Sequence, residues 1–156
     1  MRMKLFLNTA LTHKSILLLE EGAILGSYEW DEPGQESKHV LRGISSLLDE
    51  RNLSMRNIET LLVITGPGSF TGLRIVITVA NTLSFLYPHL KLQGASVGEW
   101  FAAVESGAKN LFFQVYPSDI FHFNSKGAFT DRYPTHCIPE SIDFKHSRGQ
   151  VLSNTT

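Results

Sequence analysis

The sequence predicts an α/β fold in which helices flank a mixed sheet. Three observations predict it: the first thirty residues form consecutive strand-like runs, a helical period follows them, and a buried strand then leads into a glycine-rich loop and a second helix. A second pair of strands follows a third helix. This order of strands and helices is typical of a mixed sheet covered by helices.

Short apolar runs predict the first three strands. Residues 5–7 form a run that ends at two polar residues, residues 16–19 form a second that ends at the turn 20–22, and residues 23–30 alternate between the two faces of a strand. Such runs and alternation are typical of strands. The tight turn between the second and third runs predicts an antiparallel meander.

The helical period begins near residue 37. Val40, Ile44, Leu47 and Leu48 are spaced i, i+4, i+7 and i+8, which places them on one face of an amphipathic helix. We expect a helix of about four turns, with Ser37 as its N-cap.

Strands and helices alternate after this first helix. The β-branched and aliphatic run 60–65 predicts a strand that is buried on both faces, as in parallel sheets. The later elements are a helix over 73–87 ended by Pro88, a strand over 91–94, a helix over 97–106, and strands over 110–116 and 119–124. After Ala128 the pattern fades.

Composition and charge exclude several classes of protein. Hydrophobic residues make up 42% of the 156 residues, which is too apolar for an intrinsically disordered chain. The net charge of -1 gives no basic surplus of the kind that an autonomous nucleic-acid-binding domain shows. The single cysteine excludes an internal disulfide framework. Because no apolar run has the length of a membrane span or of a signal-peptide core, we expect a cytoplasmic protein without membrane contact.

The strongest local signal is the glycine-rich loop between the buried strand and the second helix. Backbone N–H groups in such a loop, together with the positive end of the helix, form an anion site when they converge. The glycine spacing differs from a Walker A loop and from the dinucleotide fingerprint. Two interpretations stay open: a phosphate or anion site, or a tight turn whose glycines let helix and strand pack closely. The candidate residues are Gly66, Gly68, Ser69, Thr71, Gly72 and Arg74.

The second helix is apolar on almost every side. A narrow polar stripe that includes Arg74, Thr78 and Asn81 interrupts it. Such a helix needs cover on two sides, and the sheet supplies one of them. We expect the other side to form a subunit interface together with the first helix, and coverage by a small second lobe is the alternative. The candidate interface residues are Val40, Ile44, Leu47, Leu48, Leu73, Ile77 and Ala80.

The histidines and the cysteine do not predict a metal site. His122, His136, Cys137 and His146 fit no compact zinc motif, and we expect surface or half-buried side chains there. Cys137 has only His136 nearby to activate it as a nucleophile. His39 is expected to cap or pack the first helix, because no second histidine follows four residues later.

The segment 66–75 resembles the signature of the TsaB family, the non-catalytic partner in bacterial synthesis of tRNA threonylcarbamoyladenosine (t6A). Residues 5–10 resemble the opening strand and turn of that family, His39 occupies a position that is commonly histidine, and residues 94–96 resemble its Gly-Val-Ser. The resemblance spans residues 4–105. It implies an actin/Hsp70-like ATPase-type fold, with a mixed sheet flanked by helices and a reduced second lobe.

Several positions depart from the family pattern. Asn8 stands where the family usually has an aspartate, which in ATPases of this fold helps to hold a hydrated metal. Val76 replaces a glycine, and most charged members of the stretch 114–121 are missing. These departures argue against autonomous catalysis. The expected domains are an actin-like lobe over 1–105, a truncated second lobe over 106–144 and a disordered tail over 145–156.

The resemblance implies a scaffold subunit without catalytic activity of its own. Its expected partner is a TsaD-type subunit, which transfers threonylcarbamoyl to N6 of adenosine 37 in tRNA, and a TsaE-type ATPase is expected to join them. We expect tRNA contact only through the complex, self-association of the chain alone, no cofactor, and weak or no ATP binding. The alternative function is a small nucleotide-binding phosphotransferase or ATPase that uses residues 66–72. A glycoprotease-like hydrolase lacks a supporting metal pair or triad.

Overall fold

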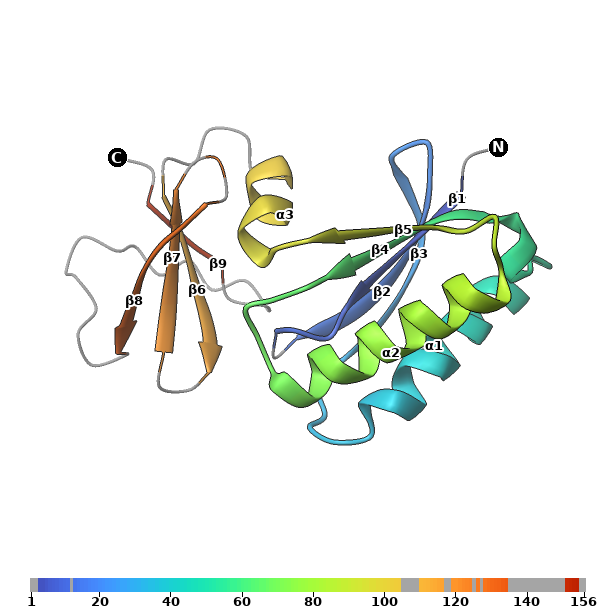
Figure 1. Cartoon of the computed structure of the whole chain (residues 1–156), viewed down its shortest axis with the longest axis horizontal. Helices are drawn as coiled ribbons and strands as arrows, with labels where there is room; N and C mark the ends of the chain where they lie inside the picture. Colours follow the sequence, from blue (N-terminus) through green and yellow to red (C-terminus); the bar gives the residue numbers. More distant parts are fainter. Residues whose placement is uncertain are drawn as a thin grey trace.

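The computed structural model describes residues 3–11, 13–104, 110–116, 119–124, 126, 128–134 and 151–154. The described elements form a five-stranded sheet with its helices and a four-stranded sheet (Figure 1). The predicted α/β class, a mixed sheet flanked by helices, is confirmed. No helix within the described ranges is long and apolar enough to cross a membrane.

The larger sheet is mixed and has its first strand at the centre. Its strands are β1 (Met3–Asn8), β2 (Lys14–Glu20), β3 (Ala23–Trp30), β4 (Ile58–Ile64) and β5 (Lys91–Ala95). Their order is β3-β2-β1-β4-β5. The β1–β2 and β2–β3 pairs are antiparallel, which confirms the predicted meander, and the β1–β4 and β4–β5 pairs are parallel.

Two long helices cover one face of this sheet. They are α1 (Glu36–Asp49) and α2 (Phe70–Leu86). The other described helices are the short 3-10 helix η1 (Met55–Asn57) and α3 (Val97–Val104). In Figure 1, α1 and α2 lie side by side across the sheet, and they contact each other as well as the strands. Val40 and Ile44 of α1 and Val76 of α2 pack into one buried cluster with Leu5 and Leu61 of the sheet.

The opposite face of the sheet contacts α3. Because successive strand residues point to opposite faces, Phe6 points away from the cluster that contains Leu5 and Leu7. It joins a second buried cluster that includes Val97, and its ring stacks on Trp100 of α3 with the centroids 4.8 Å apart. The central strand is therefore buried on both sides.

The first two α-helices begin earlier than expected. The N-cap of α1 is Gln35, which has φ 66° and makes no side-chain capping hydrogen bond, so Ser37 lies inside the first turn. α2 begins at Phe70 because Ser69 caps it: the Ser69 Oγ accepts a hydrogen bond from the Gly72 N–H at 3.2 Å. The expectation that Ser37 caps α1 is wrong.

The smaller sheet is antiparallel. Its strands are β6 (Asn110–Tyr116), β7 (Asp119–Asn124), β8 (Phe129–Pro134) and β9 (Val151–Asn154), in the order β8-β7-β6-β9. β9 lies in the segment 145–156, which we expected to be disordered, so that expectation is wrong for residues 151–154. The reason is pairing: β9 bonds the edge of β6 that β7 leaves free. Local composition does not reveal a contact between such distant parts of the chain.

The structure describes one of the four candidate metal ligands. His122 lies in β7. His136, Cys137 and His146 lie outside the described residues. Within the parts of the chain that the structure describes, no group of three metal-ligating side chains comes together.

Candidate functional site

The glycine-rich loop connects β4 to α2 at the carboxyl end of the parallel strands. Gly66 has φ +117°, a conformation that favours glycine. Its carbonyl accepts a hydrogen bond from the Val97 N–H at 2.9 Å, and the Thr65 N–H donates to the Ala95 carbonyl at 2.9 Å. These bonds tie the loop to the end of β5 and to the start of α3.

Two other glycines of the loop pack directly against the turn that follows β1. A Cβ at Gly68 would lie 2.3 Å from the Ala10 carbonyl oxygen, and one at Gly72 would lie 2.2 Å from that of Thr9. The Ser69 N–H donates to the Ala10 carbonyl at 2.8 Å, and the Thr9 hydroxyl donates to the Gly72 carbonyl at 2.7 Å. Close backbone approach is therefore the structural reason for both glycines.

Three N–H donors where the loop enters α2 are used within the chain. The N–H groups of Ser69, Gly72 and Leu73 each donate to an acceptor of the chain, at 2.8, 3.2 and 2.9 Å. An anion cradle requires such groups to converge on a ligand. The geometry thus favours the packing interpretation of Gly66, Gly68, Ser69 and Gly72.

Asn8 supports the turn on which the loop rests. Its side chain is only 4% exposed, and its Oδ1 accepts a hydrogen bond from the Ala10 N–H at 3.2 Å. An amide that bonds two residues ahead stabilises a turn. The side chain at this strand end therefore has a structural partner and carries no charge.

The remaining two loop candidates lie on either side of Gly72, at the start of α2. Thr71 and Arg74 both line a pocket of about 280 Å³ between α1 and α2. The Arg74 guanidinium carbon lies 5.5 Å from the centroid of the Phe70 ring, at a distance typical of a cation–π contact. Thr71 and Arg74 therefore line a different surface from Gly72, which contacts the turn after β1.

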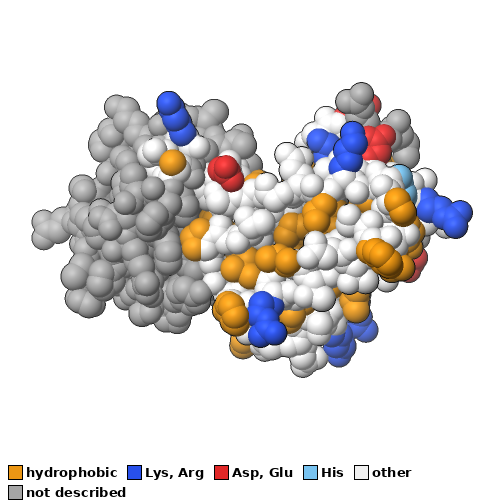
Figure 2. Space-filling model, in the orientation of Figure 1, with side chains coloured by type: hydrophobic (Ala, Val, Ile, Leu, Met, Phe, Trp, Pro, Cys, Tyr) orange, Lys and Arg blue, Asp and Glu red, His pale blue; other side chains and the backbone are white. Residues whose placement is uncertain are grey.

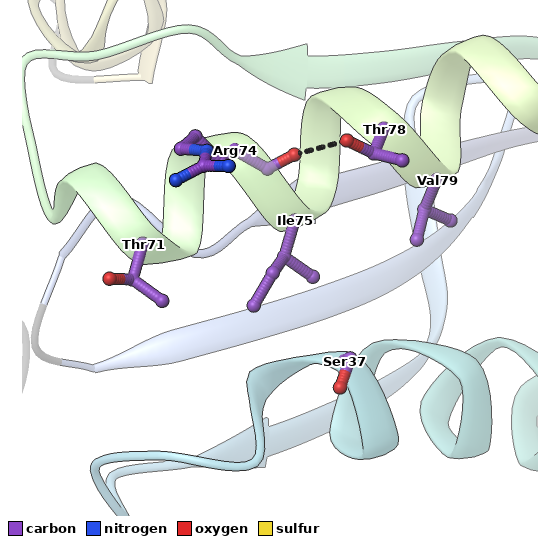
Figure 3. Close-up of a pocket in the computed structure, with 6 residues that line it drawn as sticks. All are labelled: Ser37, Thr71, Arg74, Ile75, Thr78 and Val79. Atoms are coloured by element: carbon purple, nitrogen blue, oxygen red, sulfur yellow. Dashed lines mark hydrogen bonds between the residues drawn. The ribbon is translucent and has the colours of Figure 1, made fainter.

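The pocket has an apolar floor and a polar rim. Figure 3 shows Ile75 and Val79 pointing from α2 toward α1, where Ser37 faces them. The Thr78 hydroxyl donates to the Arg74 carbonyl at 2.7 Å, within the helix. The pocket is lined by Ser37, Thr71, Arg74, Ile75, Thr78 and Val79.

Most of the expected interface residues are core residues, so that expectation is wrong for them. The physical reason is that the apolar face of α1 packs onto β2 and β3, and α2 buries its own inner face on the sheet. Leu73 is partly buried against the cluster around Phe6, and Ile77, at 40%, is exposed. The buried members are Val40, Ile44, Leu47, Leu48 and Ala80.

The exposed apolar surface lies on another face of α2. Phe70, Arg74, Ile77, Asn81 and Phe85 follow one another at helical spacing and form one exposed stripe, which we call the outer face of α2. Phe70 is 70% exposed and Phe85 is 84% exposed. Figure 2 shows hydrophobic side chains gathered over the region of α2.

The interface residues expected from the sequence include neither Phe70 nor Phe85, and they also leave out exposed apolar residues near this face or on neighbouring elements. Leu86 ends α2, Leu41 belongs to α1, and Leu92 belongs to the edge strand β5; all three are exposed. Leu41 follows Ser37 by four residues and so shares its face of α1. The signal was present in the sequence, because Leu41 lies off the apolar stripe of its amphipathic helix.

A polar cluster joins the turn after β1 to β3. The Nδ1 of His13 lies 2.5 Å from an oxygen of Asp31, and its Nε2 lies 3.0 Å from an oxygen of Glu29. Partial burial lowers the pKa of His13, but hydrogen bonds and charge from Asp31 and Glu29 outweigh it and raise the pKa above its ordinary value. Carboxylates at both ring nitrogens favour the protonated ring.

The α/β fold of the chain is shared with two solved proteins. An uncharacterized protein with similarity to peptidase YEAZ from Pseudomonas aeruginosa superimposes with a TM-score of 0.68 at 23% identity, over 92% of this chain and 71% of that one. YeaZ from Pseudomonas aeruginosa gives a TM-score of 0.66 at 24% identity, over 86% and 67% of the two chains. These likenesses establish the fold.

Sequence comparisons give partial matches to proteins of tRNA modification and to an uncharacterized protein. The family model of TsaD, the tRNA N6-adenosine threonylcarbamoyltransferase, matches residues 35–91. The tRNA threonylcarbamoyladenosine biosynthesis protein TsaB of Bacillus subtilis is 31% identical over 70 residues, which are 45% of this chain and 31% of that protein. The uncharacterized protein MG208 of Mycoplasma genitalium is 30% identical over 91 residues, which are 57% of this chain and 46% of that protein. Over this part of its length the chain is similar to TsaB and to the TsaD family model. The match spans less than half the length of either curated relative.

Proposed function

We propose that the chain is a non-catalytic subunit in the synthesis of t6A at adenosine 37 of tRNA. In this proposal it docks a TsaD-type threonylcarbamoyltransferase on the outer face of α2 and holds that partner in a competent conformation. The likeness to the Bacillus subtilis TsaB supports the pathway. The match of residues 35–91, which include α1 and α2, to the TsaD family model supports kinship with the partner itself.

The exposed apolar side chains of α2 are the observation that carries this proposal. Phe70, Ile77 and Phe85 lie along one helix face and are exposed, the two phenylalanines for most of their surface. Full burial of one such side chain contributes about 1.5–3 kcal/mol, so a partner that covers all three gains a substantial free energy. An apolar helix face of this kind is recognised by laying it into a groove or against other helices.

The packing of the loop supports a role without catalysis. Gly68 and Gly72 are in contact with the turn after β1, and the N–H groups of Ser69, Gly72 and Leu73 donate within the chain. Asn8 supplies an amide where metal-dependent ATPases of this fold use a carboxylate. The proposal therefore includes no resident cofactor and no tight binding of ATP at residues 66–72.

Further partners belong to the same proposal. A TsaE-type ATPase joins the complex of the two subunits, and tRNA is contacted through that complex. The near-neutral charge of the chain supports an indirect contact with tRNA, because direct grip on the phosphate backbone needs a basic surplus. When the partner is absent, the chain associates with itself through the outer face of α2.

Co-expression with the TsaD-type subunit of the same organism tests the proposal. Size-exclusion chromatography with light scattering is expected to give a stable 1:1 complex. Ile77→Glu and Phe85→Glu should each abolish it while leaving a folded chain, since both side chains are exposed. Ile24→Glu is the matched control: Ile24 is 62% exposed but lies on β3, away from the outer face, so its variant should still bind.

The outcomes separate the two candidate functions. Separate elution of the wild-type chain, with tight binding of magnesium-ATP that Gly68→Asp abolishes in a folded variant, would overturn the proposal in favour of a nucleotide-binding enzyme. Separate elution of the wild-type chain without ATP binding would contradict both candidate functions. Loss of the complex in the Ile24→Glu variant alone would move the contact to β3.

A further inference from the structure

We propose that the pocket between α1 and α2 receives a glutamate side chain of the protein that docks on α2, with Arg74 as the residue that pairs with its carboxylate. The proposal rests on the proposed function, because the glutamate belongs to the docking partner. It adds an ion pair, which we call the anchor, to a docking surface that otherwise consists mainly of apolar side chains.

The charge of the pocket calls for an anionic group. Arg74 is the only ionised side chain among the residues that line it. Within the described part of the chain, Arg74 forms no ion pair, and its guanidinium makes a cation–π contact with the ring of Phe70. The hydroxyl groups of Ser37 and Thr71 likewise make no hydrogen bond there. One cation and two free hydroxyls therefore line the same small space.

The shape of the pocket suits a side chain. Its volume of about 280 Å³ is at the lower end of the roughly 300–1,000 Å³ that is typical of small-molecule sites. The floor formed by Ile75 and Val79 suits the methylene stem of a glutamate, whose carboxylate then reaches the rim. A free inorganic anion would lie on these apolar side chains, with one exposed cation to hold it, and an exposed ion pair contributes little.

The Arg74 side chain already has one contact within the chain before the partner arrives. Its guanidinium lies against the Phe70 ring, which restricts the side chain. The planar guanidinium bonds a carboxylate through two parallel N–H groups, so the pairing is directional. Because Phe70 and Ile77 lie beside Arg74 on the outer face, a partner that covers them also removes water from the ion pair and strengthens it.

Binding of the TsaD-type subunit by calorimetry tests the role of Arg74. Arg74→Gln should weaken binding by about tenfold or more, and Arg74→Lys should recover part of the loss because it keeps the charge but not the fork. Arg42→Gln is the matched control, since Arg42 is an exposed arginine of α1 on the face opposite the core. All variants should retain the wild-type melting temperature, which separates a binding effect from loss of folding.

Salt dependence and a double-mutant cycle identify the group that Arg74 meets. Raising salt from about 0.1 M to about 1 M shortens the screening length from roughly 10 Å to 3 Å, so wild-type binding should weaken while Arg74→Gln shows a shallower dependence. Replacing the acidic residues of the partner by glutamine, one at a time, should reveal one glutamate whose loss adds nothing to Arg74→Gln.

Each result has a defined meaning. If the wild-type chain does not bind the TsaD-type subunit, the proposed function fails, and the anchor fails with it. If the wild type binds but Arg74→Gln binds equally well with the same salt dependence, only the anchor is overturned. If partner binding is unchanged in Arg74→Gln while titration with inorganic phosphate perturbs the Thr71 amide of the wild type alone, the pocket is a site for a free anion.

Discussion

Replacing Gly68 by alanine tests whether the glycine-rich loop is built for packing. The new Cβ would lie 2.3 Å from the Ala10 carbonyl oxygen and 2.6 Å from the Ala10 Cβ, so the loop or the turn must move. Overpacking of this kind costs about 1–3 kcal/mol. Weakening the hydrogen bond from the Ser69 N–H to the same carbonyl adds about 1 kcal/mol. The free energy of unfolding should therefore fall by about 2–4 kcal/mol.

Thermal unfolding followed by circular dichroism measures this effect. One kcal/mol shifts Tm by about 2–4 °C in a chain of this size, so Gly68→Ala should lower Tm by roughly 5–15 °C. Gly34→Ala is the control, because a Cβ there meets nothing within 4 Å and only the positive φ of +78° is strained. It should cost about 1–2 kcal/mol. An unchanged Tm in Gly68→Ala, together with loss of binding to inorganic phosphate, would refute the packing interpretation.

Three further substitutions test the core, the cap and the polar cluster. Ile44→Glu should prevent folding, because Ile44 is 6% exposed and the substitution buries a charge in the core. Far-UV circular dichroism measures the loss of structure. A folded Ile44→Glu chain would instead show that this face of α1 lies in water. Ser69→Ala removes the cap of α2 and should lower the free energy of unfolding in denaturant by about 1 kcal/mol. An unchanged free energy would show that water replaces the hydroxyl as the acceptor for the Gly72 N–H. His13→Gln should change the pH dependence of stability. Since the pKa of His13 is raised above its ordinary 6.5 in the folded chain, its contribution is complete below pH 6.5 and is lost as pH rises through the folded pKa. Unfolding at a series of pH values should thus show the wild type losing its advantage over His13→Gln with rising pH, and a constant difference would contradict the cluster.

The elements of the first lobe were predictable because local patterns encode them. The apolar runs of β1, β2 and β4 and the period of α1 reflect burial on one or two faces, which sequence spacing reports directly. The glycine-rich loop was also recognisable. Its meaning was not, because the groups that meet Gly68 and Gly72 are carbonyls of Thr9 and Ala10, about sixty residues earlier in the chain.

The sequence by itself determined the α/β class, the strand meander, the amphipathic face of α1 and the resemblance to the TsaB family. The tertiary structure decided which apolar side chains remain in water. Val40 and Ile77 are both apolar residues of amphipathic or apolar helices, and only the position of the sheet makes the first a core residue and the second an exposed one. It also decided that residues 151–154 form a strand, since the edge of β6 supplies the pairing. Hydrophobicity is a property of the residue, whereas burial depends on the neighbours that the fold brings to it.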